Sequence, residues 1–189
     1  MLPGFDVDKG LRYTKKALEL EPNNAEAHRI MGSYQMWLRN FETAEHHICR
    51  AITLNPSNAY IRARSAAFYT FNHQPERALE LLAEAEQLDP FLPVWCLEEK
   101  GVALFNLGKL KEAISALDSL TFQTFRSCSY IAACATALGE LERARNALAE
   151  AFSILPDLTV TKFLTREYYR DPADSDRIRK LLLKAGLPE

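Results

Sequence analysis

Apolar residues recur along the chain at three- and four-residue intervals, the spacing that places them on one face of an α-helix. These segments alternate with short polar connections, and several of them end on the same phrase. Ala17–Asn24 reads ALELEPNN, Ala51–Asn58 reads AITLNPSN, and Ala85–Pro90 reads AEQLDP. A further copy, AFSILP, lies at Ala151–Pro156. The pattern predicts an all-α chain built from repeated helices.

The repeated phrase has a fixed period, because Pro22, Pro56 and Pro90 are each 34 residues apart. A proline lacks the backbone donor and clashes with the preceding turn, so each one is expected to end a helix. Small residues, which let two helices approach closely, keep nearly the same interval. One set is Gly10, Ala44, Ala78, Ala113 and Ala144, and a second set is Gly32, Ala66, Gly101 and Ala132.

A 34-residue period with small residues at the helix crossings resembles the tetratricopeptide repeat (TPR) family. The resemblance implies two antiparallel helices per repeat and an all-α, right-handed α-solenoid of TPR hairpins with a C-terminal capping helix. We expect a single TPR domain over 1–189. It divides into a lone second helix at 6–21, full repeats at 25–58, 59–92, 94–124 and 125–158, and C-terminal helices with the cap at 159–189.

Three local features refine this division. Gly108 and Gly139 are expected to end helices in the left-handed conformation. The earlier repeats have Arg39-Asn40 and Asn72-His73 at the same place, and asparagine also tolerates that conformation. The second helix of the third repeat is expected to end near Leu120, which should change the pitch of the superhelix. After the repeats we expect a helix from Leu158 to about Tyr168 and a last helix opened by Asp171-Pro172 and stopped at Gly186.

Composition narrows the classes of function. The chain has 189 residues, 48% of them hydrophobic, and a net charge of −2. No basic stripe of the kind that binds nucleic acid is visible, so we expect no nucleic-acid partner. We also expect no membrane partner, because no apolar run reaches membrane-spanning length and Met1–Gly4 does not read as a signal peptide.

Four cysteines are present and none are spaced as CxxC, which argues against a zinc or redox motif. We expect free, buried thiols and a cytoplasmic location. The histidines are expected to be structural or on the surface, and the carboxylates Glu98 and Glu99 to be solvated. No spacing of residues indicates a catalytic site, a metal site or a cofactor, so the sequence does not predict an enzyme. The cysteines are Cys49, Cys96, Cys128 and Cys134, and the histidines are His28, His46, His47 and His73.

In TPR proteins the first helix of each repeat lines a concave groove, and the resemblance transfers those positions to this chain. Tyr60, Trp95 and Phe105 would supply aromatic anchors for an apolar peptide or an amphipathic helix. Alternatively, these residues pack against neighbouring helices. The lysines and asparagines that clamp chaperone tails are missing from these positions. The groove candidates are Arg29, Ser33, Met36, Tyr60, Ala63, Ala67, Thr70, Trp95, Glu98, Val102 and Phe105, with Glu26, Arg126, Ser129, Ala133 and Thr136 at related positions.

Three hypotheses for function follow. The leading one is a non-catalytic module that binds a protein or peptide partner in the concave groove. In the second, the chain is a regulatory region in cis of a nucleotide cyclase or a winged-helix regulator, since its tail resembles the C-terminal TPR region of bacterial class III adenylate/guanylate cyclase-type signalling proteins. That resemblance is carried by Phe163, Arg166-Glu167, 169–172 and 183–189. In the third, the incomplete N-terminal repeat exposes an apolar face through which the chain forms a homodimer.

Overall fold

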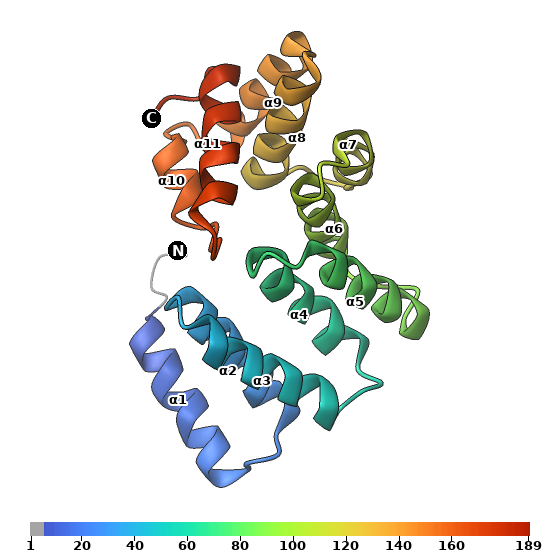
Figure 1. Ribbon diagram of the computed structural model, residues 1–189, viewed down its shortest axis with the longest axis vertical. Helices are drawn as coiled ribbons and strands as arrows, with labels where there is room; N and C mark the ends of the chain where they lie inside the picture. Colours follow the sequence, from blue (N-terminus) through green and yellow to red (C-terminus); the bar gives the residue numbers. More distant parts are fainter. Residues whose placement is uncertain (1–5) are drawn as a thin grey trace.

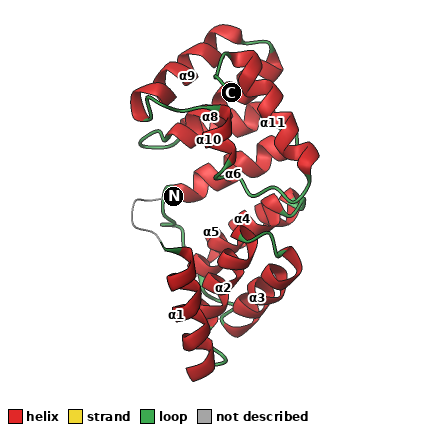
Figure 2. Ribbon diagram, turned by 90° about the vertical axis from the view of Figure 1, so that its left-hand side faces the viewer, coloured by secondary structure: helices red, strands yellow, loops and turns green. Residues whose placement is uncertain are grey.

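A computed structural model describes residues 6–189, so the prediction about Met1–Gly4 lies outside the described part. Within 6–189 the chain is all helical, with eleven helices and no strand (Figures 1 and 2). The helices are α1 (Val7–Leu20), α2 (Ala25–Trp37), α3 (Phe41–Leu54), α4 (Ala59–Phe71), α5 (Pro75–Leu88), α6 (Trp95–Asn106), α7 (Leu110–Asp118), α8 (Phe125–Leu138), α9 (Leu141–Ile154), α10 (Val160–Leu164) and α11 (Pro172–Ala185).

Consecutive helices pack as hairpins: α2 on α3, α4 on α5, α6 on α7, and α8 on α9. The first helices of the hairpins also contact one another in order, from α2 through α4 and α6 to α8. Figure 1 shows the resulting arc from α1 to α11, and in Figure 2 α6 lies between a lower group, α1–α5, and an upper group, α8–α11. The predicted α-solenoid is therefore confirmed, with α11 packed on α8 and α9 as the C-terminal cap.

The small residues lie where the sequence placed them, at helix crossings. A Cβ atom added to Gly32 would come within 2.7 Å of the Ile48 side chain and 3.2 Å of the Ala44 carbonyl oxygen. At Gly101 the same atom would come within 2.5 Å of Leu117. The two helices of a hairpin thus approach so closely that a side chain at either position would force its neighbour to shift.

The turns inside the hairpins confirm one prediction and correct another. Gly108 and Gly139 do adopt the left-handed conformation, with φ of 73° and 81°. In the two earlier hairpins Arg39 and His73 take it, with φ of 64° and 61°, and not the neighbouring asparagines. The left-handed residue is always the one directly before the N-cap of the next helix, and Asn72 lies one position too early. The position of a residue relative to the next helix therefore decides which residue is left-handed, even though asparagine tolerates this conformation better than arginine or histidine.

The C-terminal segment departs most from the expectation. The helix predicted from Leu158 to Tyr168 ends at Leu164, and residues 165–171 continue without helical structure until Asp171 caps α11. We call residues 165–171 the strap. The helix stops because the strap makes tertiary contacts instead: the Arg170 backbone N–H, for example, donates to the Phe71 carbonyl oxygen at 2.8 Å. As expected, Gly186 ends α11, in the left-handed conformation.

Two further expectations concern the cysteines and the third repeat. Cys96, Cys128 and Cys134 are buried and unpaired, whereas Cys49 is exposed. α7 has nine residues against fourteen in α3, α5 and α9, and it ends two residues before Leu120.

Within 6–189, no helix is both long and apolar enough to cross a membrane.

Candidate binding groove and the C-terminal strap

The inner side of the arc is hollowed by a cavity of about 540 Å³, which we call the inner groove. Its walls come from α2, α4, α6, the start of α8, and the strap. Nine of the residues predicted from the TPR register line it: Arg29, Ser33, Met36, Tyr60, Ala63, Ala67, Trp95, Glu98 and Arg126.

Three predicted groove residues lie elsewhere. Thr70, Val102 and Phe105 are at most 1% exposed, and none of them lines the inner groove. Phe105 cannot act as an anchor for a partner because it packs on Tyr130 and is covered by the Arg177 guanidinium, 4.7 Å from the ring centre. At the related positions of the fourth repeat, where α11 packs on α8, the three residues Ser129, Ala133 and Thr136 are buried.

An aromatic and arginine stack forms one wall of the inner groove. The Tyr60 and Trp95 rings meet edge to face with their centres 6.0 Å apart. The Arg64 guanidinium lies 3.8 Å from the centre of the Trp95 ring and 5.3 Å from that of Tyr60, and its Nε–H donates to the Tyr60 hydroxyl at 3.1 Å. Arg29 lies over the same tyrosine ring at 5.6 Å. Such cation–π contacts hold guanidinium groups flat against the wall.

Several lining residues were missed by the sequence analysis. Ile30, Tyr34, Trp37 and Phe71 lie on the predicted helices, each next to a residue that the TPR register selected. The groove positions given by the register were therefore one residue too narrow on α2 and α4. Arg166 could not be found in this way, because it belongs to the strap and not to any repeat.

The strap runs from the C-terminal helices to the N-terminal repeats and makes polar contacts there. An Arg39 Nη donates to the Tyr169 carbonyl oxygen at 2.5 Å. The Arg170 guanidinium donates to Asn72 at 3.0 Å and to Glu42 at 2.5 Å. These contacts join residues that are about a hundred or more positions apart in sequence.

Aromatic contacts fix the middle of the strap. Tyr168 lies against Trp37 and Phe71, with ring centres 6.2 Å apart in each case. Tyr169 packs edge to face on Phe71 at 5.1 Å and is 2% exposed. The strap is therefore part of the packed interior of the arc and forms a fixed border of the inner groove.

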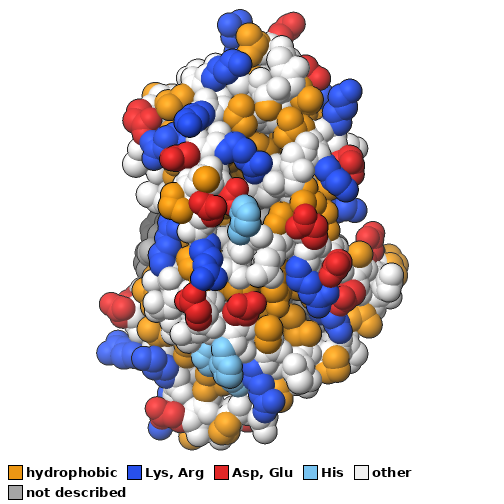
Figure 3. All heavy atoms as spheres, in the orientation of Figure 1, with side chains coloured by type: hydrophobic (Ala, Val, Ile, Leu, Met, Phe, Trp, Pro, Cys, Tyr) orange, Lys and Arg blue, Asp and Glu red, His pale blue; other side chains and the backbone are white. Residues whose placement is uncertain are grey.

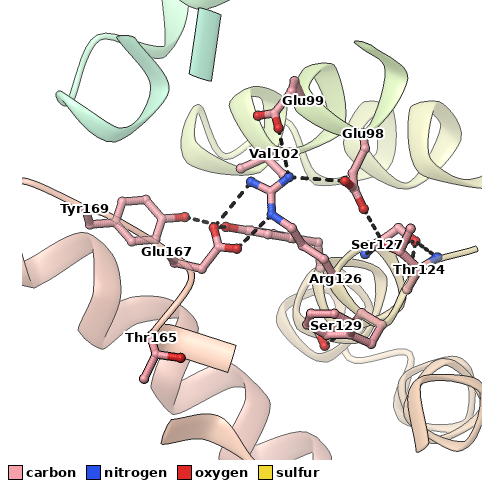
Figure 4. Close-up of polar contacts among 12 residues, drawn as sticks. Glu98, Glu99, Val102, Thr124, Arg126, Ser127, Ser129, Thr165, Glu167 and Tyr169 are labelled. Carbon is pink, nitrogen blue, oxygen red and sulfur yellow. Dashed lines mark hydrogen bonds and ion pairs between the residues drawn. The ribbon is translucent and has the colours of Figure 1, made fainter. Parts of the chain in front are cut away.

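A buried ion-pair cluster around Arg126 anchors the strap to the third and fourth repeats, and Figure 4 shows its members converging from α6, α8 and the strap. The Arg126 Nε atom lies 2.7 Å from Glu167, and its Nη1 atom lies 3.1 Å from Glu99 and 3.4 Å from Glu98. The Tyr130 hydroxyl donates to Glu167 at 2.6 Å. The expectation that Glu98 and Glu99 are solvated is wrong, because their side chains are only 14% and 17% exposed and pair with a cation from the next repeat.

Burial sets the direction of the pKa shifts in this cluster. It raises the pKa of Glu167, and the attraction of Arg126 opposes that rise. Burial also disfavours the Arg126 cation, but the surrounding carboxylates outweigh it and raise the pKa of Arg126 well above its usual value. The guanidinium therefore stays charged, and it supplies the one cation that Glu98, Glu99 and Glu167 share inside the arc.

The histidines occupy two separate contacts. His28 Nδ1 lies 2.8 Å from His47 Nδ1, and His28 Nε2 lies 3.0 Å from the Pro22 carbonyl oxygen. Burial and the neighbouring His28 and His46 lower the pKa of His47 to about 4, so the His47 imidazole is neutral at pH 7. The exposed His73 side chain lies 2.8 Å from an Asp174 carboxylate oxygen, which raises the pKa of His73.

One group of side chains in the described residues has the composition of a metal site: His73, Asp171 and Asp174, whose ligand atoms lie within 4.8 Å of one another. Each atom already has a structural use that explains its position. Asp171 accepts from the Ala173 backbone N–H to cap α11, and Asp174 binds His73. The group thus ties the turn before α5 to the start of α11.

Comparison with known proteins agrees with the repeat pattern. No family model matches the chain. The small glutamine-rich tetratricopeptide repeat-containing protein alpha of Homo sapiens is 38% identical over 69 residues, which are 35% of this chain and 22% of that protein, and the Bos taurus protein matches equally. The chain thus spans about a fifth of the length of these curated relatives.

Solved structures resemble the whole arc. PilW, a type IV pilus biogenesis factor, superimposes with a TM-score of 0.74 at 17% identity, over 95% of this chain and 84% of PilW. TTC0263, a TPR protein of Thermus thermophilus, gives 0.67 at 19% identity over 94% and 91%. YrrB, described as a TPR protein with an unusual peptide-binding site, gives 0.58 at 17% identity over 91% and 90%. The 34-residue period, the closely packed hairpins and these likenesses together show that the chain has the α-solenoid fold of tetratricopeptide repeat proteins, which are generally non-catalytic scaffolds for protein interactions.

Proposed function

We propose that the chain is a non-catalytic protein-interaction module that holds a segment of a partner polypeptide in the inner groove. The observation that carries this proposal is the aromatic wall of Tyr60 and Trp95, of which Tyr60 is 41% exposed although it is a large apolar ring. Partly exposed aromatic residues in a concave surface are the usual anchors of a protein interface. The cavity volume also lies in the range of roughly 300–1,000 Å³ that is common for ligand sites.

The strap supports this proposal from within the same molecule. Next to the inner groove, the inner surface of α2 and α4 already binds an extended stretch of the chain itself, through a backbone hydrogen bond to Phe71 and ring contacts of Tyr168. A surface that binds one extended segment through its backbone and its aromatic side chains is suited to bind another beside it.

The side chains that could perform chemistry favour a binding role over a catalytic one. Burial raises the pKa of Cys96 to about 11 and the pKa values of Cys128 and Cys134 to about 12, so these thiols are protonated and unreactive at neutral pH. The groove carboxylates Glu98 and Glu99 are both bound to Arg126, so they have a structural use of their own.

Two finer assignments remain predictions. A cytoplasmic location is supported by four free cysteines, one of them exposed. A regulatory role in cis of a cyclase or a winged-helix protein rests on the tail resemblance. The residues that carry that resemblance, such as Glu167 and Tyr169, hold the strap in place and so have a structural use of their own.

Selection from a display library of random dodecapeptides tests the proposed function. We expect wild-type protein to select peptides, and Tyr60→Ala combined with Trp95→Ala to abolish their binding while the helical circular dichroism is unchanged. Phe91→Ala, which removes a 92% exposed aromatic ring outside the inner groove, is the matched control and should leave binding intact. A wild-type protein that selects no peptide, or a double variant that binds them as well as wild type does, contradicts the proposal.

A further inference from the structure

We infer that the inner groove takes a peptide segment whose anionic side chain lies beside an apolar one, and that Arg64 and Arg166 are the residues that contact the anion. This inference rests on the proposed function and adds the chemistry of the partner. It combines two cations without a carboxylate partner, an aromatic wall next to one of them, and a strap that holds the other in place.

Arg64 is charged, exposed and positioned, yet it forms no ion pair with any residue in 6–189. Its guanidinium is stacked on Trp95 at 3.8 Å and held by the Tyr60 hydroxyl through Nε, which leaves the two Nη groups available to a ligand. Stacking of this kind restricts the side chain before binding, so less conformational entropy is lost when an anion arrives.

Arg166 reaches the inner groove from the strap. It is exposed, lies over the Phe125 ring at 4.9 Å, and also forms no ion pair within the described part of the chain. Its backbone is fixed because the next residue, Glu167, is 2% exposed and bound to Arg126. The strap therefore places a cation at the border of the groove that no repeat could supply.

The other charged residues that line the inner groove all have a bound partner. Glu98 and Glu99, the two carboxylates that line it, are bound to Arg126, and Arg29 is bound to Glu26 at 2.5 Å. Arg64 and Arg166 are the two cations of the inner groove that no carboxylate of residues 6–189 contacts, so they are the ones available to an anion. Figure 3 shows acidic and basic side chains intermixed on one face of the molecule, which fits a local recognition site better than a broad basic surface.

The residue types indicate which ligand group is recognised. A planar guanidinium binds a carboxylate or a phosphate through two parallel N–H···O bonds, which a lysine cannot do. The rings of Tyr60 and Trp95 beside Arg64 would cover a neighbouring apolar side chain of the same segment. Both features are satisfied by an acidic residue, or a phosphorylated one, next to a large apolar residue.

Four synthetic peptides test the inference. Each is acetylated and amidated at its ends, so that no terminal carboxylate is present, and each has the form Ala-Leu-X-X-Phe-Leu-Ala. The pair X-X is Asp-Glu, Asn-Gln, Lys-Lys or phosphoserine-Glu. Binding is followed by tryptophan emission, since both tryptophans of the chain, Trp37 and Trp95, line the inner groove.

We expect the Asp-Glu peptide to bind about tenfold more tightly than the Asn-Gln peptide, and the Lys-Lys peptide to bind most weakly. Arg64→Gln and Arg166→Gln should each reduce that preference several-fold, and together they should remove it. Raising the salt concentration from about 50 to about 500 mM should also reduce the preference for the Asp-Glu peptide, because exposed charges are screened. Arg145→Gln is the matched control, since Arg145 is an exposed arginine on α9 outside the groove.

The outcomes separate this inference from the proposed function. Tightest binding of the phosphoserine peptide supports the inference and identifies phosphate as the preferred anion. Equal binding of the Asp-Glu and Asn-Gln peptides overturns the inference. The proposed function still stands in that case if Tyr60→Ala combined with Trp95→Ala abolishes the binding of both peptides. Binding of none of the four peptides also overturns the inference, whereas the proposed function is then judged by the display selection alone.

Discussion

The two ends of the arc are built from similar amphipathic helices but have very different surroundings. In α1 the only buried residue is Thr14, while Tyr13 and Leu20 are 66% and 76% exposed. At the other end Tyr130 and Phe163 are fully buried beneath the strap and α11. A TPR helix buries its apolar side chains only where a neighbour is stacked on each side, so its stability is a property of the stack and not of the helix.

The strap adds a second difference. Repeats in a solenoid normally contact only their neighbours, which makes stability a sum of local terms. Here Arg170 and Glu42, separated by 128 positions, bind each other, and Tyr169 accepts a hydrogen bond from Arg39. We therefore expect the strap to couple the unfolding of the C-terminal helices to that of the first two repeats.

The largest expected effect comes from Arg126→Ala, which removes the cation that joins the strap to the repeats. It leaves Glu167, Glu98 and Glu99 without a counter-ion in a largely buried site, a loss of roughly 3–5 kcal/mol in the free energy of unfolding. Urea unfolding followed by circular dichroism measures it. Lys162→Ala, which breaks an exposed pair with Asp157, is the control and should change the free energy of unfolding far less, because water screens exposed pairs.

Adding Glu167→Ala to Arg126→Ala sharpens this prediction. The double variant should be less destabilised than the sum of the two single variants, because the second change removes a carboxylate that the first left unpaired. Additive losses would contradict a stabilising interaction between Arg126 and Glu167.

The next effect concerns packing at the N-terminal side. Gly32→Ala places a Cβ atom 2.7 Å from Ile48, which should lower the free energy of unfolding by about 1–3 kcal/mol. Ile48→Val in the same chain should restore part of that loss by making room. If Gly32→Ala is neutral, the hairpin of α2 and α3 is looser than the packed C-terminal end.

A smaller effect is the pH dependence of the free energy of unfolding, to which His47 and His73 contribute with opposite signs. The pKa of His47 is lowered to about 4, so its contribution is complete above the usual value near 6.5 and is lost as the pH falls towards 4. The pKa of His73 is raised by Asp174, so its contribution is complete below 6.5 and is lost as the pH rises through that raised pKa.

Urea midpoints at pH 4.5, 6 and 8.5 check both signs. Relative to His47→Gln, wild type should lose stability on going to pH 4.5. Relative to His73→Gln, wild type should be more stable at pH 6 than at pH 8.5. The same pH dependence in the two comparisons would contradict these opposite signs.

The smallest effect is expected at the exposed face of α1. Tyr13→Ser with Leu20→Gln removes apolar surface that is already in solvent, so the free energy of unfolding should change by no more than about 0.5 kcal/mol. The sequence also predicts a homodimer through this end, and the double variant should then be monomeric in sedimentation velocity. A wild-type chain that is monomeric at high concentration contradicts the dimer.

The sequence alone determined the repeating part of this protein. The period of 34 residues placed the hairpins, Gly32 and Gly101 marked their closest contacts, and the register placed Tyr60 and Trp95 on the wall of the inner groove. These features are local or periodic, and each copy of the repeat supports the interpretation of the others.

Only the tertiary structure decided which of those residues stay accessible and what faces them. It buried Phe105 beneath Arg177, turned Glu98 and Glu99 towards Arg126, and brought Arg166 to the groove. The strap that does this has no repeat and no regular secondary structure, and its partners lie up to 130 positions away. Such contacts follow from the closing of the arc in space, which no local pattern of residues records.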